Sequence, residues 1–145
     1  MKSNVLLIVV DSLRADKFYG IKKTVETPNI DKLINNGFVF TNAISSTDTT
    51  YASLGSLFSG KYPYNHQISW FKNHSNATEC FDDLKNNNFH LYGTFQNQTF
   101  FQTLSSIFHE VDLVDGEPYL RLFEGLGDKI LKRLKCIKNS EPWIY

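Results

Sequence analysis

This 145-residue chain has few cysteines, a single methionine and no net charge. Its two cysteines, Cys80 and Cys136, lie far apart, which excludes a disulfide framework and a cysteine-rich metal site. Fifteen basic and fifteen acidic side chains balance, so no overall field attracts nucleic acid or an anionic membrane. No apolar run approaches the roughly 18 residues of a membrane span, and no cleavable signal is recognisable. These absences predict a globular protein of the cytoplasm.

What the chain does have is an alternation of strand-forming and helix-forming segments. Residues 4–10, 38–43, 89–95 and 111–114 are typical of strands, and residues 142–145 resemble the beginning of another. Residues 28–36, 51–59, 77–84, 98–108 and 118–138 favour helices, and residues 62–66 a loop. The alternation predicts an α/β fold with a mainly parallel sheet. With no repeat or linker, we expect a single domain over residues 1–145 that is incomplete at its C-terminus.

Asp11 follows the first predicted strand directly. Residues 4–10 are apolar without alternation, which is typical of a strand buried on both faces of a parallel sheet. Open α/β sheets bind their ligands at the carboxyl ends of strands. Asp11 is therefore a candidate metal ligand or catalytic carboxylate, although a carboxylate in this place is also a common cap or loop residue.

Thr50 stands at the start of the helix that follows the second predicted strand. The N-terminus of a helix offers backbone N–H groups and partial positive charge, which suit a phosphate or sulfate group. A divalent cation stabilises the alkoxide of a hydroxyl placed there, so that the hydroxyl becomes a nucleophile. Asp11 would supply one oxygen ligand to that cation. A threonine at a helix start is also an ordinary cap, and position alone leaves both interpretations open.

Four segments together resemble the sulfatase-like branch of the alkaline phosphatase superfamily, in the order and spacing of that family. They are residues 4–16, 27–33, 37–43 and 50–66. The resemblance implies an alkaline phosphatase-like, three-layer α/β/α sandwich with a divalent metal site for Mn, Zn, Mg or Ca. It also implies that Asp11 is the first metal-binding carboxylate. Thr50 falls on the position of the nucleophile and metal ligand, and Thr49 takes that position if the register shifts by one.

The chain also departs from the pattern of true sulfatases. These carry a Cys or Ser that is converted to formylglycine, with Pro two residues and Arg four residues further on. Here the three positions hold Thr50, Ala52 and Leu54. Threonine is not a substrate for that conversion, so the resemblance favours members that handle phosphoryl groups through a phospho-threonine. The implied function is a metal-dependent hydrolase or transferase of phosphate or sulfate esters, on a small molecule or a polymer.

Further substrate contacts are expected from the backbone N–H groups of Tyr51 and Ala52 and from the side chains of Lys61 and His66. A loop histidine with satisfied partners is the alternative for His66. The family's later Asp and His ligands have no counterpart, because no Asp-His pair follows the nucleophile segment. The alternative function is therefore a truncated, catalytically silent domain that binds anions or a partner. A sheet edge exposed at residues 142–145 would favour self-association.

Overall fold

The computed structural model describes residues 2–67, 79–116, 118–137 and 140–145. The chain forms two compact units, and each is described by itself. Met1–Leu7 and Ser46–Tyr145 make up the sheet unit, and Ile8–Ser45 make up the small unit. Among the described residues, no helix is both long and apolar enough to span a membrane.

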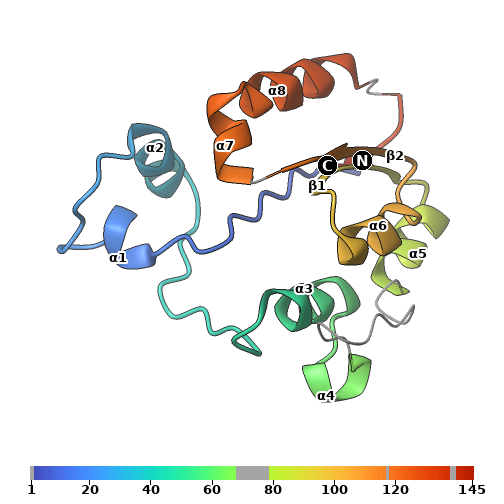
Figure 1. The fold of residues 1–145 in the computed structure, drawn as a ribbon, viewed down its shortest axis with the longest axis horizontal. Helices are drawn as coiled ribbons and strands as arrows, with labels where there is room; N and C mark the ends of the chain where they lie inside the picture. Colours follow the sequence, from blue (N-terminus) through green and yellow to red (C-terminus); the bar gives the residue numbers. More distant parts are fainter. Residues whose placement is uncertain (1, 68–78, 117, 138–139) are drawn as a thin grey trace. The chain divides into compact units, whose positions relative to one another are not determined.

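The sheet unit is built on three parallel strands (Figure 1). Their order is β2–β1–β3, with bounds Glu110–Val114 for β2, His90–Gln96 for β1 and Trp143–Ile144 for β3. Helices lie between the strands along the chain, as parallel pairing requires. The strands predicted at residues 89–95, 111–114 and 142–145 are therefore confirmed.

The apolar run near the amino terminus joins this sheet over only a few residues. Val5 forms a parallel bridge with Ile144, and the N–H of Leu7 donates to the carbonyl of Tyr145 at 2.7 Å. Side chains from Val5 to Val10 are 45–70% exposed. The prediction of a strand buried on both faces over residues 4–10 is thus wrong for the described residues. A strand needs partners on its edges and cover on its faces, and here it has a partner on one edge only.

Because Val5 and Leu7 pair with residues 143–145, β3 is not at the edge of the sheet. β3 lies between β1 on one side and residues 5–7 on the other. Residues 142–145 are therefore interior to the sheet, and the prediction of an exposed edge there is wrong. Within the described residues, the outermost segments are β2 and residues 5–7.

Six helices accompany the strands in the described part of the sheet unit. They are α3 (Thr50–Ser59), α4 (Pro63–His66), α5 (Glu79–Asn86), α6 (Thr99–Ser105), α7 (Pro118–Phe123) and α8 (Leu126–Cys136). Residues 62–66, predicted as a loop, contain α4, which has proline at its first position. Of the predicted helix at 77–84, residues 77–78 lie outside the described residues.

The single helix predicted over residues 118–138 is divided into α7 and α8. Gly125 stands at the break with a φ of +86°, a left-handed conformation that glycine adopts without a steric penalty. Residue 138 lies outside the described residues. The apolar spacing across this segment indicated a helix correctly, but it did not reveal that the axis changes at Gly125.

The hydrophobic core lies on one face of β1. Leu91 is fully buried there, and the side chains packed with it come from α3, α5, α6 and the turn after α6: Leu54, Phe58, Phe81, Phe100, Leu104 and Ile107. Side chains alternate across a strand, so Tyr92 lies on the opposite face, where Arg133 of α8 stacks on its ring. Helices therefore cover both faces of the sheet, as Figure 1 shows for the sheet unit. This arrangement agrees with the predicted α/β/α fold.

The small unit contains α1 (Ala15–Phe18) and α2 (Pro28–Asn36). Helix α2 begins and ends as predicted, with Pro28 at its first position and Gly37 after its last. Residues 38–43 form no strand, and Phe38 and Phe40 are 98% and 84% exposed. The strand prediction is wrong here because no described segment offers this run a ladder partner or a face to bury.

Candidate active-site helix

Helix α3 places Thr50 at its first helical position, with an exposed side chain. Thr49 is the N-cap, in extended conformation, and its carbonyl accepts the first intrahelical bond from the N–H of Ser53 at 2.9 Å. The hydroxyl of Thr49 makes no capping bond. The alternative role of an ordinary cap position thus falls on Thr49 and not on Thr50, and no acidic side chain occupies the first turn.

The helix that carries Thr50 is anchored firmly at both ends. Near its start, the hydroxyl of Tyr51 donates to Oε1 of Gln98 at 2.9 Å, and the Tyr51 ring meets the Phe100 ring edge-on at 4.9 Å. At its end, Gly60 has a φ of +67° and donates its N–H to the carbonyl of Ser56. This left-handed residue closes the helix in the usual way. A helix start held by aromatic packing is a rigid support for an attacking hydroxyl.

His66 is a buried structural residue of the same region. It is 2% exposed, and its Nε2 lies 3.0 Å from the hydroxyl of Ser56. Burial lowers the pKa of His66, while a hydrogen bond to the carbonyl of Ala52 acts in the opposite direction. The ring therefore joins α4 to α3, and burial disfavours its charged form. His66 therefore has hydrogen-bond partners within the protein, as the alternative interpretation expects. Its contact with substrate stays a prediction.

Lys61 lies beyond the far end of α3 from Thr50. Its Nζ pairs with Oε2 of Glu79 at 2.6 Å, which links the loop after α3 to α5. Ten helical residues extend about 15 Å along the axis, so Lys61 is remote from the start of the helix. Its expected contact with substrate at Thr50 also stays a prediction, and that contact would need a large ligand.

Asp11 belongs to the small unit and Thr50 to the sheet unit, and each is described with its own unit. Asp11 is exposed in a turn, followed by Ser12 with a φ of +57°. Two residues further on, Arg14 forms a bidentate pair with Asp16, with both distances 2.9 Å. The structure therefore describes Asp11 as an accessible carboxylate on a tight turn.

The donors present in the described ranges fall short of a complete metal site. Among those residues, no group of three or more His, Cys, Asp or Glu side chains is placed to hold a metal ion. A carboxylate and a hydroxyl are the right donor type for Mg²⁺, Ca²⁺ or Mn²⁺, but such ions take about six or more ligands. The described residues therefore do not by themselves fit the divalent cation that the family implies.

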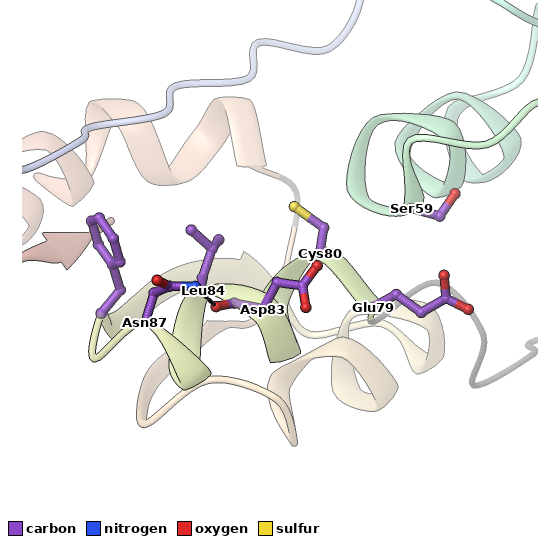
Figure 2. A pocket seen from close by; sticks show the side chains of 7 residues that line it. Ser59, Glu79, Cys80, Asp83, Leu84 and Asn87 are labelled. Atoms are coloured by element: carbon purple, nitrogen blue, oxygen red, sulfur yellow. Dashed lines mark hydrogen bonds between the residues drawn. The ribbon is translucent and has the colours of Figure 1, made fainter.

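An open pocket lies at the other end of α3 from Thr50 (Figure 2). Its volume is about 390 Å³. Its lining comes from the last residue of α3, from α5 and from the turn after α5: Ser59, Glu79, Cys80, Asp83, Leu84, Asn87 and Phe89. The side-chain amide of Asn87 donates to the backbone carbonyl of Asp83 at 2.9 Å. Since Ser59 and Thr50 are the two ends of one helix, this pocket is not the site of the candidate nucleophile.

Comparison with known proteins places these observations in a family. The family model described as Sulfatase matches residues 3–111, which is most of the chain. The chain belongs to the sulfatase family. The match includes Asp11, α3 and Thr50, and the alkaline phosphatase-like fold expected of the family agrees with the parallel sheet of the sheet unit.

Three curated relatives share part of this sulfatase-family chain. An arylsulfatase of Clostridium perfringens is 32% identical over 88 residues, which are 54% of this chain and 18% of that protein. The multifunctional alkaline phosphatase superfamily protein PehA of Trinickia caryophylli is 36% identical over 72 residues, 46% of this chain and 14% of that protein. An N-acetylgalactosamine-6-O-sulfatase of Bacteroides thetaiotaomicron is 37% identical over 68 residues, 46% of this chain and 13% of that protein. The chain thus spans less than a fifth of the length of these relatives. No solved structure matches it.

Sequence reasoning missed the hydrogen bonds that fix the histidines of the sheet unit. Nothing in the sequence marks Ser56 as the partner of His66, because the contact depends on how α4 folds back on α3. Pro63 was the available signal, since proline at a first helical position indicates a short helix after α3.

Proposed function

We propose that this sulfatase-family protein transfers phosphoryl or sulfuryl groups from esters through the hydroxyl of Thr50. The observation that carries the proposal is the place of Thr50 in α3. It is an exposed hydroxyl on the first turn of a well-anchored helix, within the segment that the family model matches. The N–H groups of a first turn lack intrahelical acceptors and attract anions, so a tetrahedral anion placed there lies beside the nucleophile.

The reaction proceeds in two displacements. The Thr50 oxygen forms a bond to phosphorus or sulfur as the bond to the ester oxygen breaks, and the Thr50 proton passes to the ester oxygen, which leaves as the alcohol. Water or an acceptor alcohol then displaces Thr50 and restores its hydroxyl. The N–H groups of Tyr51 and Ala52 stabilise the charge on the non-bridging oxygens. Because threonine does not become formylglycine, a phosphate ester is the preferred substrate class.

Asp11 has a separate role in this proposal. We assign its carboxylate as one oxygen ligand of a divalent cation, which takes further ligands besides Asp11. The support is its accessible position on the turn after residues 4–10 and its place within the matched segment. Loss of cation binding in Asp11→Asn, measured by calorimetry with Mn²⁺, would support the assignment. Unchanged affinity in that variant would contradict it.

A silent, anion-binding domain is the second candidate function. The observation that favours it is the shortage of metal donors among the residues that the structure describes. Such a domain would bind phosphate or sulfate at the start of α3 and catalyse nothing. It would share the anion site with the enzyme and lack its turnover.

One set of assays separates the two functions. We would measure hydrolysis of p-nitrophenyl phosphate, bis(p-nitrophenyl) phosphate and p-nitrophenyl sulfate, with Mn²⁺, Zn²⁺, Mg²⁺ or Ca²⁺ added in turn. Metal-dependent turnover that Thr50→Ala abolishes and Thr50→Ser retains supports the enzyme. Thr49→Ala is the matched control, one residue away on the N-cap, and should retain turnover. If Thr49→Ala abolishes turnover and Thr50→Ala does not, the nucleophile is Thr49. Absence of turnover with every ester and metal favours the silent domain.

A further inference from the structure

One hydrogen bond of the sheet unit joins a histidine side chain to the backbone of β1. The N–H of Leu91 donates to Nδ1 of His109 at 2.9 Å, and the backbone N–H of His109 returns a bond to the carbonyl of Leu91 at 2.9 Å. His109 precedes β2, so its imidazole continues the β1–β2 pairing where the backbone ladder begins at Glu110. The imidazole Nδ1 thus accepts the bond that a backbone carbonyl accepts in a regular strand pair.

This bond fixes the protonation state of His109. A backbone N–H can only donate, so Nδ1 must be the unprotonated nitrogen and Nε2 must carry the ring proton. A proton added to the ring goes to Nδ1, so that the N–H of Leu91 and the new N–H of Nδ1 are two donors facing each other. The acceptor of the Leu91 N–H then disappears.

The two ends of the bond differ in their access to solvent. His109 is exposed, so protons reach its ring and a charged ring can turn outward. Leu91 is fully buried at the centre of the core, so its released N–H has no water to replace the lost acceptor. An unsatisfied buried amide is costly, and the strand must open locally to hydrate it.

We propose that His109 is a pH-sensitive latch that holds the start of β1 to β2 when neutral and releases it when protonated. The consequence is not confined to one strand pair. Leu91 also pairs with Ile144 of β3, and Ile144 bridges to Val5. Release at Leu91 therefore loosens the sheet where β2, β1, β3 and the amino-terminal run are joined side by side.

The charged and titratable groups around His109 set the pH at which the latch opens. His90 of β1 stacks on the His109 ring at 4.3 Å, Lys85 lies on α5, and Glu110 and Glu141 lie at β2 and before β3. Desolvation, His90 and Lys85 lower the pKa of His109 below its usual 6.5, and the two glutamates act in the opposite direction. The latch is therefore closed above the usual histidine pKa and opens only as the solution is made more acidic than that.

His66 provides an internal contrast. Its Nε2 faces the hydroxyl of Ser56, which donates to a neutral ring and accepts from a charged one. Protonation of His66 thus leaves both ring nitrogens with a partner. His109, in contrast to His66, faces an obligatory donor and loses its hydrogen bond when it gains a proton.

The test is amide hydrogen exchange at Leu91, followed by NMR from pH 8 to pH 4.5 and corrected for the intrinsic pH dependence of exchange. We expect the protection of Leu91 to fall by about tenfold across the His109 transition, as loss of one buried hydrogen bond implies. His109→Asn keeps a non-titrating acceptor in the place of Nδ1, so the transition should vanish while protection persists. His90→Phe retains a stacked ring without its charge and should move the transition to higher pH.

Two further results decide the proposal. The imidazole nitrogen shifts of His109 should show an unprotonated Nδ1 at pH 8, and a protonated Nδ1 there would overturn the latch. Protection of Leu91 that stays constant from pH 8 to pH 4.5, or that falls equally in His109→Asn, would also overturn it. His66→Asn is the matched control and should keep the Leu91 transition. A loss of the transition in that variant would show that His66, and not His109, controls it.

Discussion

The small unit and the sheet unit differ in how much of the family pattern each contains and in how many buried side chains each has. Residues 8–45 contain most of three of the four segments that resemble the sulfatase family, yet no residue in this range is buried. Residues 46–145 hold every buried side chain of the described structure, from Ala52 to Ile107. Much of the family pattern thus lies in a unit that has no buried residue. A family motif can therefore indicate the chemistry of a site without indicating which residues stabilise the fold.

The largest expected effect comes from a matched pair of leucine-to-alanine substitutions, one in each unit. Leu91 is 0% exposed in the sheet unit, and Leu33 is 72% exposed in the small unit. We expect Leu91→Ala to reduce the free energy of unfolding by about 2–5 kcal/mol, because it leaves a cavity in the core. Leu33→Ala should change it by about 0.5 kcal/mol or less. Urea unfolding followed by circular dichroism measures both, and equal losses would break the comparison.

A smaller effect is expected from acid. Burial lowers the pKa of His66, and desolvation together with the charges of His90 and Lys85 lowers the pKa of His109. Both histidines belong to the sheet unit, and residues 8–45 contain no histidine. A lowered folded-state pKa means that the unfolded chain binds protons first. This contribution to stability is complete above pH 6.5 and is lost as pH falls below it. Urea midpoints at pH 7.5 and 5.5 should therefore differ, with the lower value in acid. Identical midpoints would contradict the pKa directions.

The smallest expected effect lies in the small unit. Lys23 pairs with Asp31 of α2 at 2.5 Å, and the two side chains are 26% and 40% exposed. Exposed pairs contribute about 1 kcal/mol or less and are screened by salt. Asp31→Asn should thus lower stability slightly in dilute buffer and have almost no effect in 1 M NaCl. A large loss that persists in salt would show that this unit depends on the pair, which its lack of buried residues does not suggest.

Local sequence patterns were sufficient for elements that the sheet unit completes with its own residues. β1, β2 and β3 lie at the predicted strands, and α2 begins at Pro28 as predicted. Helix α3 begins at Thr50, one residue before the predicted start at residue 51. The runs at 4–10 and 38–43 have equally clear strand composition. They fail because a strand also requires neighbours, which composition does not supply. Gly125 was visible in the sequence, but only the structure shows that it divides α7 from α8.

The candidate site was predictable to a similar degree. The sequence placed Thr50 at a helix start, and the structure refines this by making Thr49 the cap and Thr50 the first helical residue. The partners of His66 and His109 were not predictable, because Ser56 and the Leu91 amide meet these rings only after distant elements pack. Side-chain networks depend on tertiary geometry, and local patterns carry no signal for them.

The measurement that tests the central claim most directly is trapping of the covalent intermediate on Thr50. The protein, expressed with any in-frame sequence that flanks it, would be mixed with a phosphate ester and divalent metal, quenched in acid and digested for mass spectrometry. We expect a phosphoryl group on Thr50 in the wild type and in Thr49→Ala, and none in Thr50→Ala. Turnover with the phosphoryl group on another residue, or turnover that survives Thr50→Ala, would contradict it.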